Sequence, residues 1–89
     1  MLTYEDCLAL TRLTDEEVDA IAVHEHLPEI IALELGHYLC ETPNGERCLS
    51  RMILDDIEAA RARGDLVRAA RLRLVLAHFV HTHPAAAAA

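Results

Sequence analysis

The chain has 89 residues and a net charge of −7, and 53 % of its residues are hydrophobic although only three are aromatic. A chain of this length forms one domain that buries roughly 60 % of its unfolded surface, so its core must be small and mainly aliphatic. The negative charge and the lack of an aromatic stacking platform argue against nucleic-acid binding. No apolar run reaches the roughly 18 residues needed to cross a bilayer, and acids stand where a signal peptide has its basic start. We therefore expect a cytoplasmic protein that makes no contact with a membrane.

Two capping boxes mark the first helical starts. Thr3 is followed three residues later by Asp6, and Thr14 is followed at the same spacing by Glu17. In a capping box the two residues each bind the backbone N–H of the other, which satisfies donors that a helix start leaves free. The sequence therefore predicts a short helix after Thr3 and a second helix after Thr14.

Proline and the sequence TPNG mark the next boundaries. Pro28 fits the first turn of a third helix, where its missing N–H costs no hydrogen bond, and we expect this helix to run to about Glu41. TPNG, residues 42–45, is predicted to form a turn. A fourth helix is predicted from about Glu46 to Arg63.

The end of the fourth helix also starts the fifth. Gly64 is typical of the position just past a helix end, Asp65 is a typical cap, and Pro84 ends the fifth helix. No segment alternates with a period of two. We therefore predict an all-α fold, a small compact bundle of about five helices, with one short N-terminal helix and four longer ones in a single domain over residues 1–84. The Ala-rich tail, residues 85–89, has nothing to pack and is expected to be disordered.

Helical periodicity predicts the core faces of three helices. The second, fourth and fifth helices each carry one apolar stripe. The predicted core positions are Val18, Ile21, Ala22, Leu49, Ile53, Ile57, Ala60, Ala69, Leu72, Leu76, Phe79 and Val80.

The third helix raises a different question, because an acid interrupts its apolar residues. Glu34 is surrounded on the helical wheel by Leu27, Ile30, Ile31, Leu35 and Tyr38. Glu25 follows the stripe of the second helix by one turn, so both glutamates and Tyr38 are predicted to be buried polar residues. A buried carboxylate needs an arginine, hydrogen-bond donors, a metal or a raised pKa. The simplest interpretation is a structural pair of Glu34 with an arginine, with the Tyr38 hydroxyl, or at a wet dimer contact.

A metal site is the alternative interpretation of the same helix. Glu34 and His37, at positions i and i+3, resemble the Glu-x-x-His element by which ferritin-like bundles hold iron. This resemblance covers four residues and implies iron, manganese or zinc as the bound metal. The chain has no second such element, so the site would have to be shared across a homodimer, with Glu25 or Asp56 as further ligands.

Charge is unevenly distributed along the chain. Residues 1–44 hold ten acids and one arginine, a net charge of −9, whereas residues 45–89 hold five acids and seven arginines, a net charge of +2. Arg68, Arg71 and Arg73 lie in a segment that contains no acid. We expect this segment to dock against acidic helices of its own chain or of a second copy.

The histidines, cysteines and serine give weaker signals. Histidines in the range 78–83 are favoured near a helix C-terminus by the helix dipole, and they need no metal.

Cys7, Cys40 and Cys48 are an odd set, which we interpret as reduced thiols, and a zinc site near Cys40 would lack a fourth ligand. Ser50 is the only serine, and no glycine-rich elbow or phosphate loop accompanies it. Enzymatic activity is not expected.

The leading functional prediction is a small helical protein–protein interaction or assembly module that forms a homodimer. Leu33 and Leu39 widen the apolar arc of the third helix beyond what one small core would cover, so they are the predicted interface. The alternative is the metal-binding protein described above, with Glu34 and His37 in a site shared across the dimer. A third interpretation is a pH-responsive element that uses buried glutamate and the six histidines.

Overall fold

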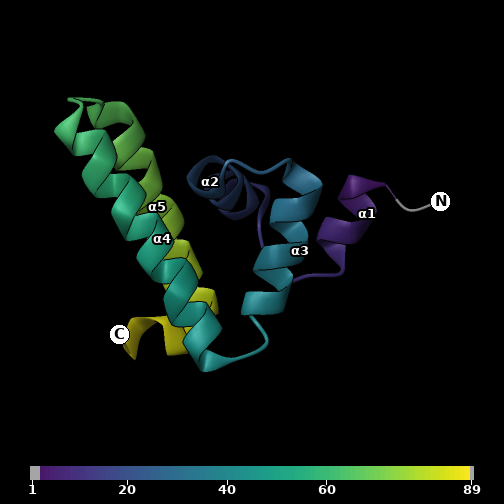
Figure 1. Cartoon of the computed structure of the whole chain (residues 1–89). Helices are drawn as coiled ribbons and strands as arrows, with labels where there is room; N and C mark the ends of the chain where they lie inside the picture. Colours follow the sequence, from purple (N-terminus) through teal and green to yellow (C-terminus); the bar gives the residue numbers. More distant parts are fainter. Residues whose placement is uncertain (1–2, 89) are drawn as a thin grey trace.

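The structure, a computed structural model, describes residues 3–88. Within that range the chain forms five α-helices and one short 3-10 helix, and it has no strand (Figure 1). The elements are α1 (Tyr4–Ala9), α2 (Asp15–Glu25), α3 (Glu29–Leu39), α4 (Pro43–Ala62), α5 (Leu66–Thr82) and η1 (Pro84–Ala88). The predicted all-α bundle of one short and four longer helices is therefore confirmed.

Both predicted capping boxes are present. Thr3 Oγ1 accepts a hydrogen bond from Asp6 N at 3.1 Å, and Thr3 N donates to Asp6 Oδ2 at 3.1 Å. Thr14 and Glu17 exchange the same pair of bonds at 2.9 and 3.2 Å. Asp65 caps α5 as predicted, because its Oδ1 accepts from the backbone N–H of Arg68 at 3.1 Å. Local hydrogen bonds thus set three helix starts.

The prediction of a turn at TPNG is wrong, because this sequence begins α4. Thr42 is the cap, with its Oγ1 accepting from Gly45 N at 3.0 Å, and Pro43 occupies the first helical position. This is the arrangement in which proline loses no hydrogen bond. A Cβ atom at Gly45 would lie 1.8 Å from the carbonyl oxygen of Leu39, so only glycine fits this tight corner between α3 and α4. Pro28 likewise caps α3 and precedes its first turn.

Helices α4 and α5 form a hairpin, and the end of the chain folds back onto it (Figure 1). Gly64 has a φ of 77°, which suits glycine in the position after a helix. The structure differs from the expectation of a disordered tail over residues 85–88. This segment continues as η1 and packs on α4, where Ala86 is 2 % exposed. Ala89 lies outside the described residues.

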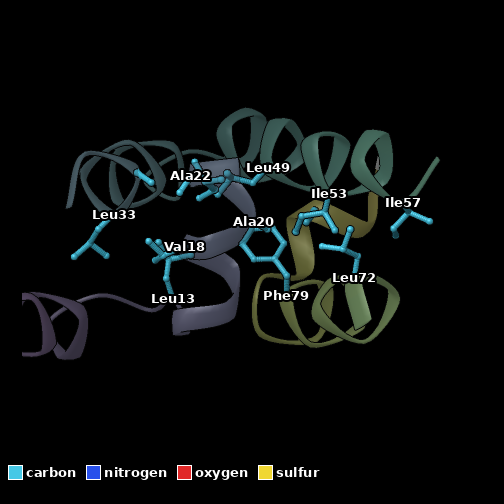
Figure 2. Close-up of a cluster of buried hydrophobic side chains, with 13 residues drawn as sticks. Leu13, Val18, Ala20, Ala22, Leu33, Leu49, Ile53, Ile57, Leu72 and Phe79 are labelled. Atoms are coloured by element: carbon cyan, nitrogen blue, oxygen red, sulfur yellow. The ribbon is translucent and has the colours of Figure 1, made fainter. Parts of the chain in front are cut away.

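The core lies between α2, α3 and the α4–α5 hairpin (Figure 2). Every predicted core position of α2 and α4 is buried. In α5, Ala69, Leu72 and Phe79 are buried, whereas Leu76 and Val80 are half-buried and pack on the edge of the cluster. The single apolar stripe of each of these helices therefore predicted its core face correctly.

Helix α3 is rotated relative to its predicted orientation. Its buried residues are Ala32, Leu33 and Gly36. A Cβ atom at Gly36 would lie 2.7 Å from Leu13 Cδ1 and 2.8 Å from Ile21 Cδ1, so the small residues face α2 and allow close packing. The larger aliphatic residues of α3 are turned outward as a result.

The predictions of buried polar residues in this region are wrong. Glu34 is exposed, and the side chain of Tyr38 on the same outer face is 69 % exposed. Glu25 is also exposed, and its Oε2 lies 2.7 Å from Nδ1 of the neighbouring His24. An exposed carboxylate keeps its hydration, so none of these residues needs a buried partner.

The predicted interface leucines are also placed differently. Leu33 is buried in the core of its own chain, and Leu39 is half-buried against that core. The same rotation of α3 explains both corrections, because it directs Leu33 and Leu39 inward and exposes Ile30 and Ile31 in their place.

Candidate functional site

A groove runs between the end of α1 and the outer face of α3. It consists of two adjoining hollows of about 230 and 220 Å³. The first is lined by Cys7, Leu10, Thr11, Ile30, Leu33, Glu34 and His37, and the second by Leu10, Thr11, Arg12, His37, Cys40 and Glu41. Because the two hollows share three lining residues, they form one continuous surface, which we call the α1/α3 groove.

The floor of the groove is one face of α3. Ile30, Leu33 and His37 follow one another at spacings of three and four residues, so their side chains lie in a row along the helix, and Glu41 follows just beyond the helix end. At 1.5 Å per residue this row is about 10 Å long. Leu33 closes the bottom of the groove, and Ile30 is 41 % exposed beside it. The floor is therefore apolar at one end and polar at the other.

The opposite wall is held by the segment between α1 and α2. Thr11 Oγ1 donates to the carbonyl oxygen of Leu8 at 2.8 Å and accepts from Leu13 N at 3.2 Å. The Arg12 guanidinium donates to the carbonyl oxygen of Thr82 at the end of α5. Leu10, which these bonds position, remains 74 % exposed at the edge of the groove. The apolar side chain of Leu10 is thus held in a solvent-exposed position beside the apolar part of the groove floor.

A tyrosine links α1 itself to α2. None of the described residues of α1 is fully buried. The Tyr4 hydroxyl donates to Asp15 Oδ1 at 3.0 Å, and burial together with the charge of Asp15 raises the pKa of Tyr4 well above its usual range. The phenol therefore stays protonated as a donor, and it anchors α1 beside the groove.

The rims of the groove carry mainly negative charge. Glu34 and Glu41 are exposed on the α3 side. Arg12 at one end of the groove carries a positive charge, and one of its N–H groups already donates to the carbonyl oxygen of Thr82. The surroundings of the groove thus favour a cationic partner over an anionic one.

The thiol in the groove is held in its neutral form. Burial, and then the negative charges of Glu46 and Glu17, raises the pKa of Cys40 to about 11 from its ordinary value of 9.0. A thiol of this kind is a poor nucleophile and a poor metal ligand near neutral pH, because both roles need the thiolate. Cys40 therefore contributes packing surface to the groove.

The predicted metal ligands are not brought together within one chain. Glu34 and His37 line the same hollow, but Glu25 pairs with His24 on α2 and Asp56 lies on α4. Within the described residues, no group of three or more histidine, cysteine or carboxylate side chains could hold a metal ion. A site shared with a second chain stays a prediction.

Asp56 is one of the carboxylates that the structure buries in part. Its Oδ2 atom is buried and has no hydrogen-bond partner in the part of the chain that the structure describes. Burial raises the pKa of Asp56 above its ordinary value of 3.8, although the nearby charges of His24 and Arg68 act in the opposite direction.

Arg68 pairs with Asp19 of α2 at 3.9 Å, which confirms that the arginine-rich segment docks against an acidic helix of its own chain. Arg71 and Arg73 remain exposed.

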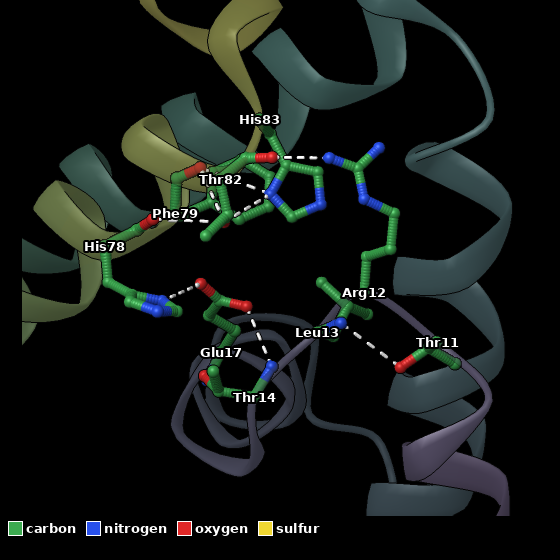
Figure 3. A network of polar contacts seen from close by, with 9 residues as sticks. All are labelled: Thr11, Arg12, Leu13, Thr14, Glu17, His78, Phe79, Thr82 and His83. Carbon is green, nitrogen blue, oxygen red and sulfur yellow. Dashed lines mark hydrogen bonds and ion pairs between the residues drawn. The ribbon is translucent and has the colours of Figure 1, made fainter.

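A second polar cluster joins α2 to α5, and the sequence analysis did not find it (Figure 3). Glu17 is only 2 % exposed. Its Oε1 accepts from Thr14 N at 2.9 Å, and its Oε2 lies 3.4 Å from His78 Nδ1. The capping-box motif pointed to Glu17, but only the packing of α5 over the start of α2 makes it a buried residue.

His83 lies on the other side of this cluster and is fully buried. Its ring stacks on Phe79 with centroids 4.4 Å apart, and its Nδ1 lies 3.2 Å from the Phe79 carbonyl oxygen and 3.0 Å from Thr82 Oγ1. Its Nε2 atom has no partner among the described residues. The interpretation of this histidine by the helix dipole missed its burial, because η1 folds back over the end of α5. The stacking and burial fit a structural role.

Comparison with known proteins gives no assignment. No protein-family model matches the chain, and neither a curated protein nor a solved structure matches it significantly. None of the helices between residues 3 and 88 is long and apolar enough to cross a membrane. The groove and its charges are therefore the basis for a functional proposal.

Proposed function

We propose that the protein is a helical association module that buries the α1/α3 groove against a helix of another chain. The observation that carries this proposal is the gathering of exposed apolar side chains around the groove. Leu10 and Ile30 are 74 % and 41 % exposed there, and Ile31 and Tyr38 continue the apolar surface along α3. An exposed apolar patch with a polar rim is characteristic of a protein interface.

The dimensions of the groove support a helical ligand. The row of Ile30, Leu33 and His37 is about 10 Å long, which matches two turns of an α-helix at about 5.4 Å per turn. An amphipathic helix enters such a groove with anchors at positions i, i+3 or i+4, and i+7. The acidic rim formed by Glu34 and Glu41 favours a helix that carries basic residues beside its apolar face. Binding, and not catalysis, is the proposed role.

A homo-oligomer in the cytoplasm is the proposed form of the protein. A chain of this size has a small core, so burial of the groove would add apolar contacts that one copy cannot make alone. The uneven charge of the chain gives a second copy both the acidic and the basic surfaces that association needs.

Sedimentation equilibrium on three proteins tests the association role of the groove. Wild type should self-associate at low micromolar concentration, and Leu10→Arg should weaken association by about tenfold or more, because it places a charge on the apolar surface. Val23→Arg is the matched control, since Val23 is 51 % exposed on α2 and does not line the groove. A wild type that stays monomeric at about 100 μM, a hundredfold above the expected range, would rule out the proposal, and so would Leu10→Arg that associates like wild type.

The metal-binding alternative retains one supporting observation. Glu34 and His37 line the same hollow, so a docked second chain could add the ligands that one chain lacks. Elemental analysis of the associated protein tests this directly. Stoichiometric iron, manganese or zinc that disappears in Glu34→Gln would favour the metal site. An associated protein that is free of metal would exclude it.

A further inference from the structure

We propose that the helix that fills the α1/α3 groove is α5 of a second copy of this chain. This inference rests on the association role proposed above and names its partner. It joins the two exposed apolar surfaces of the molecule, which are the groove and the outer face of α5.

The outer face of α5 carries an apolar stripe of the right spacing. Val67, Ala70, Leu74 and Ala77 are exposed and follow one another at intervals of three, four and three residues, as in one seam of a coiled coil. Val67 and Leu74 are 66 % and 74 % exposed. The stripe is about 15 Å long at 1.5 Å per residue, so it spans the whole row of groove residues on α3. Its two alanines would allow the helix to sit deep between α1 and α3.

The charges of the stripe and of the groove are complementary. Arg71 and Arg73 are exposed and flank the stripe on its two sides, and α5 contains no acid. Glu34 and Glu41 lie on the α3 side of the groove, so the arginine on that side of the stripe would meet an acidic rim. Such pairing steers the encounter and selects one orientation of the helix. Arg12, at one end of the groove, is the group that this docking must keep clear of the arginines.

The surface beside Leu74 adds a feature of shape. A hollow of about 320 Å³ lies there, lined by Thr14, Glu16, Val75, His78 and Leu74 itself. When α5 enters the groove of another copy, the protruding Leu10 of that copy can occupy this hollow. Both surfaces would then bury their most exposed leucine.

Pairing of two identical surfaces is less favourable. Two α5 stripes packed against one another would bring Arg71 and Arg73 of one copy near the same arginines of the other. Two outer faces of α3 related by a two-fold axis at Glu34 would bring two carboxylates together. Like charges in such contacts oppose association, whereas α5 in the groove pairs opposite charges.

Helix α5 packs along α4 of its own chain, so a single chain cannot fill its own groove with α5. Helices α1 and α3 lie towards one end of the molecule and the α4–α5 hairpin towards the other (Figure 1), and the longest dimension is 42 Å. Docking of this kind is head-to-tail. Each added copy leaves one groove and one stripe free, which allows assemblies larger than a dimer.

A mixing experiment tests the identity of the partner helix. Leu10→Arg disables the groove, and Leu74→Glu disables the stripe. Both positions are highly exposed, so the fold should survive, and circular dichroism with thermal melting checks this. Each variant alone should sediment as a monomer at concentrations where wild type associates. An equimolar mixture should form a 1:1 dimer, because each variant keeps the surface that the other lacks. Mixing Leu74→Glu with the control Val23→Arg should also give association, since the control retains both surfaces.

The outcomes separate this inference from the proposal on which it rests. If Leu74→Glu associates like wild type while Leu10→Arg does not, the groove is an interface but α5 is not its partner. If both variants are monomeric and their mixture stays monomeric, head-to-tail docking is contradicted. If Leu10→Arg associates like wild type, the groove is not the interface and both proposals fail.

Discussion

Gly36 of α3 lies directly against Ile21 of α2, so closely that a Cβ atom at position 36 would come within 2.8 Å of Ile21 Cδ1. This contact determines the rotation of α3. Gly36 and Ala32 face the core. Ile30 lies about one third of a helical turn from Gly36, so its side chain faces outward and becomes part of the groove. The proposed interface therefore depends on a glycine that touches no partner.

Substitution of Gly36 tests this packing. Gly36→Ala should gain up to about 1 kcal/mol of helix propensity but lose roughly 1–3 kcal/mol to overpacking, for a net loss of about 1 kcal/mol. Gly45→Ala should cost more, because its Cβ would meet the carbonyl oxygen of Leu39, which cannot move as a side chain can. Urea denaturation of both variants measures the difference. A stabilised Gly36→Ala would show that α3 packs less closely.

The same contact explains which parts of the fold could be predicted from the sequence. Helices α2 and α4 each carry one narrow apolar stripe, so periodicity identified their core faces. The apolar residues of α3 cover more than half of its circumference, and periodicity cannot choose among them. Ala32 and Gly36 decide the choice by their small size, which adds little to a hydrophobicity pattern but allows α2 to approach.

The groove could not be predicted for a related reason. Its wall is the segment around Leu10, which is held by local bonds of Thr11 and by the bond from Arg12 to Thr82 at the far end of the chain. Glu34 and His37 were identified from the sequence as a possible metal pair, and the structure places both in the groove. Glu17 is buried because α5 packs over the start of α2, and His83 is buried because η1 folds back over the end of α5. Neither arrangement can be predicted from a local sequence pattern.

Glu17 should contribute to stability mainly as a hydrogen-bond acceptor. Glu17→Ala removes the bond from Thr14 N and leaves a small cavity, which should cost about 1–3 kcal/mol. Glu17→Gln keeps an amide oxygen that can accept the same bond, so its loss should be under about 1 kcal/mol. Denaturation at pH 7 compares the two variants. Equal losses would indicate that the charge facing His78 matters more than the capping bond.

Asp56 should make stability fall as the pH rises above about 4. Burial raises its pKa from the ordinary value of 3.8, so the folded chain holds the proton more tightly than the unfolded chain. The stabilisation is present below the unfolded pKa and is lost as the pH rises through the folded one. Asp56→Asn should therefore stabilise the protein at pH 7 by about 1 kcal/mol or less, since solvent reaches part of the side chain, and should give no gain near pH 3.

The neighbouring acid is the control for this measurement. Asp55 pairs with Arg51 at 3.3 Å on the surface of α4, so Asp55→Asn should be neutral or slightly destabilising at pH 7. If Asp56→Asn destabilises the protein at neutral pH by more than this control, the ionised carboxylate is stabilised by Arg68, and burial is not the dominant effect.

The cysteines should differ in their rate of alkylation. The pKa of Cys40 is about 11, two units above its ordinary value, so its thiolate fraction at pH 8 is roughly 100-fold smaller than that of an unperturbed thiol. Cys48 is exposed and should react first with iodoacetamide. Mass spectrometry of partly alkylated protein gives both rates. Comparable rates at the two positions would contradict the burial of Cys40.

Nuclear magnetic resonance at increasing protein concentration tests the central claim, that the α1/α3 groove is an association surface, without any substitution. Backbone amide signals of ¹⁵N-labelled protein would be followed from dilute to concentrated solution. We expect concentration-dependent shifts at Leu10, Ile30 and Glu34 in the groove and at Leu74 on α5, with little change at Val23. Spectra that do not change with concentration, or shifts confined to residues outside the groove, would contradict the account.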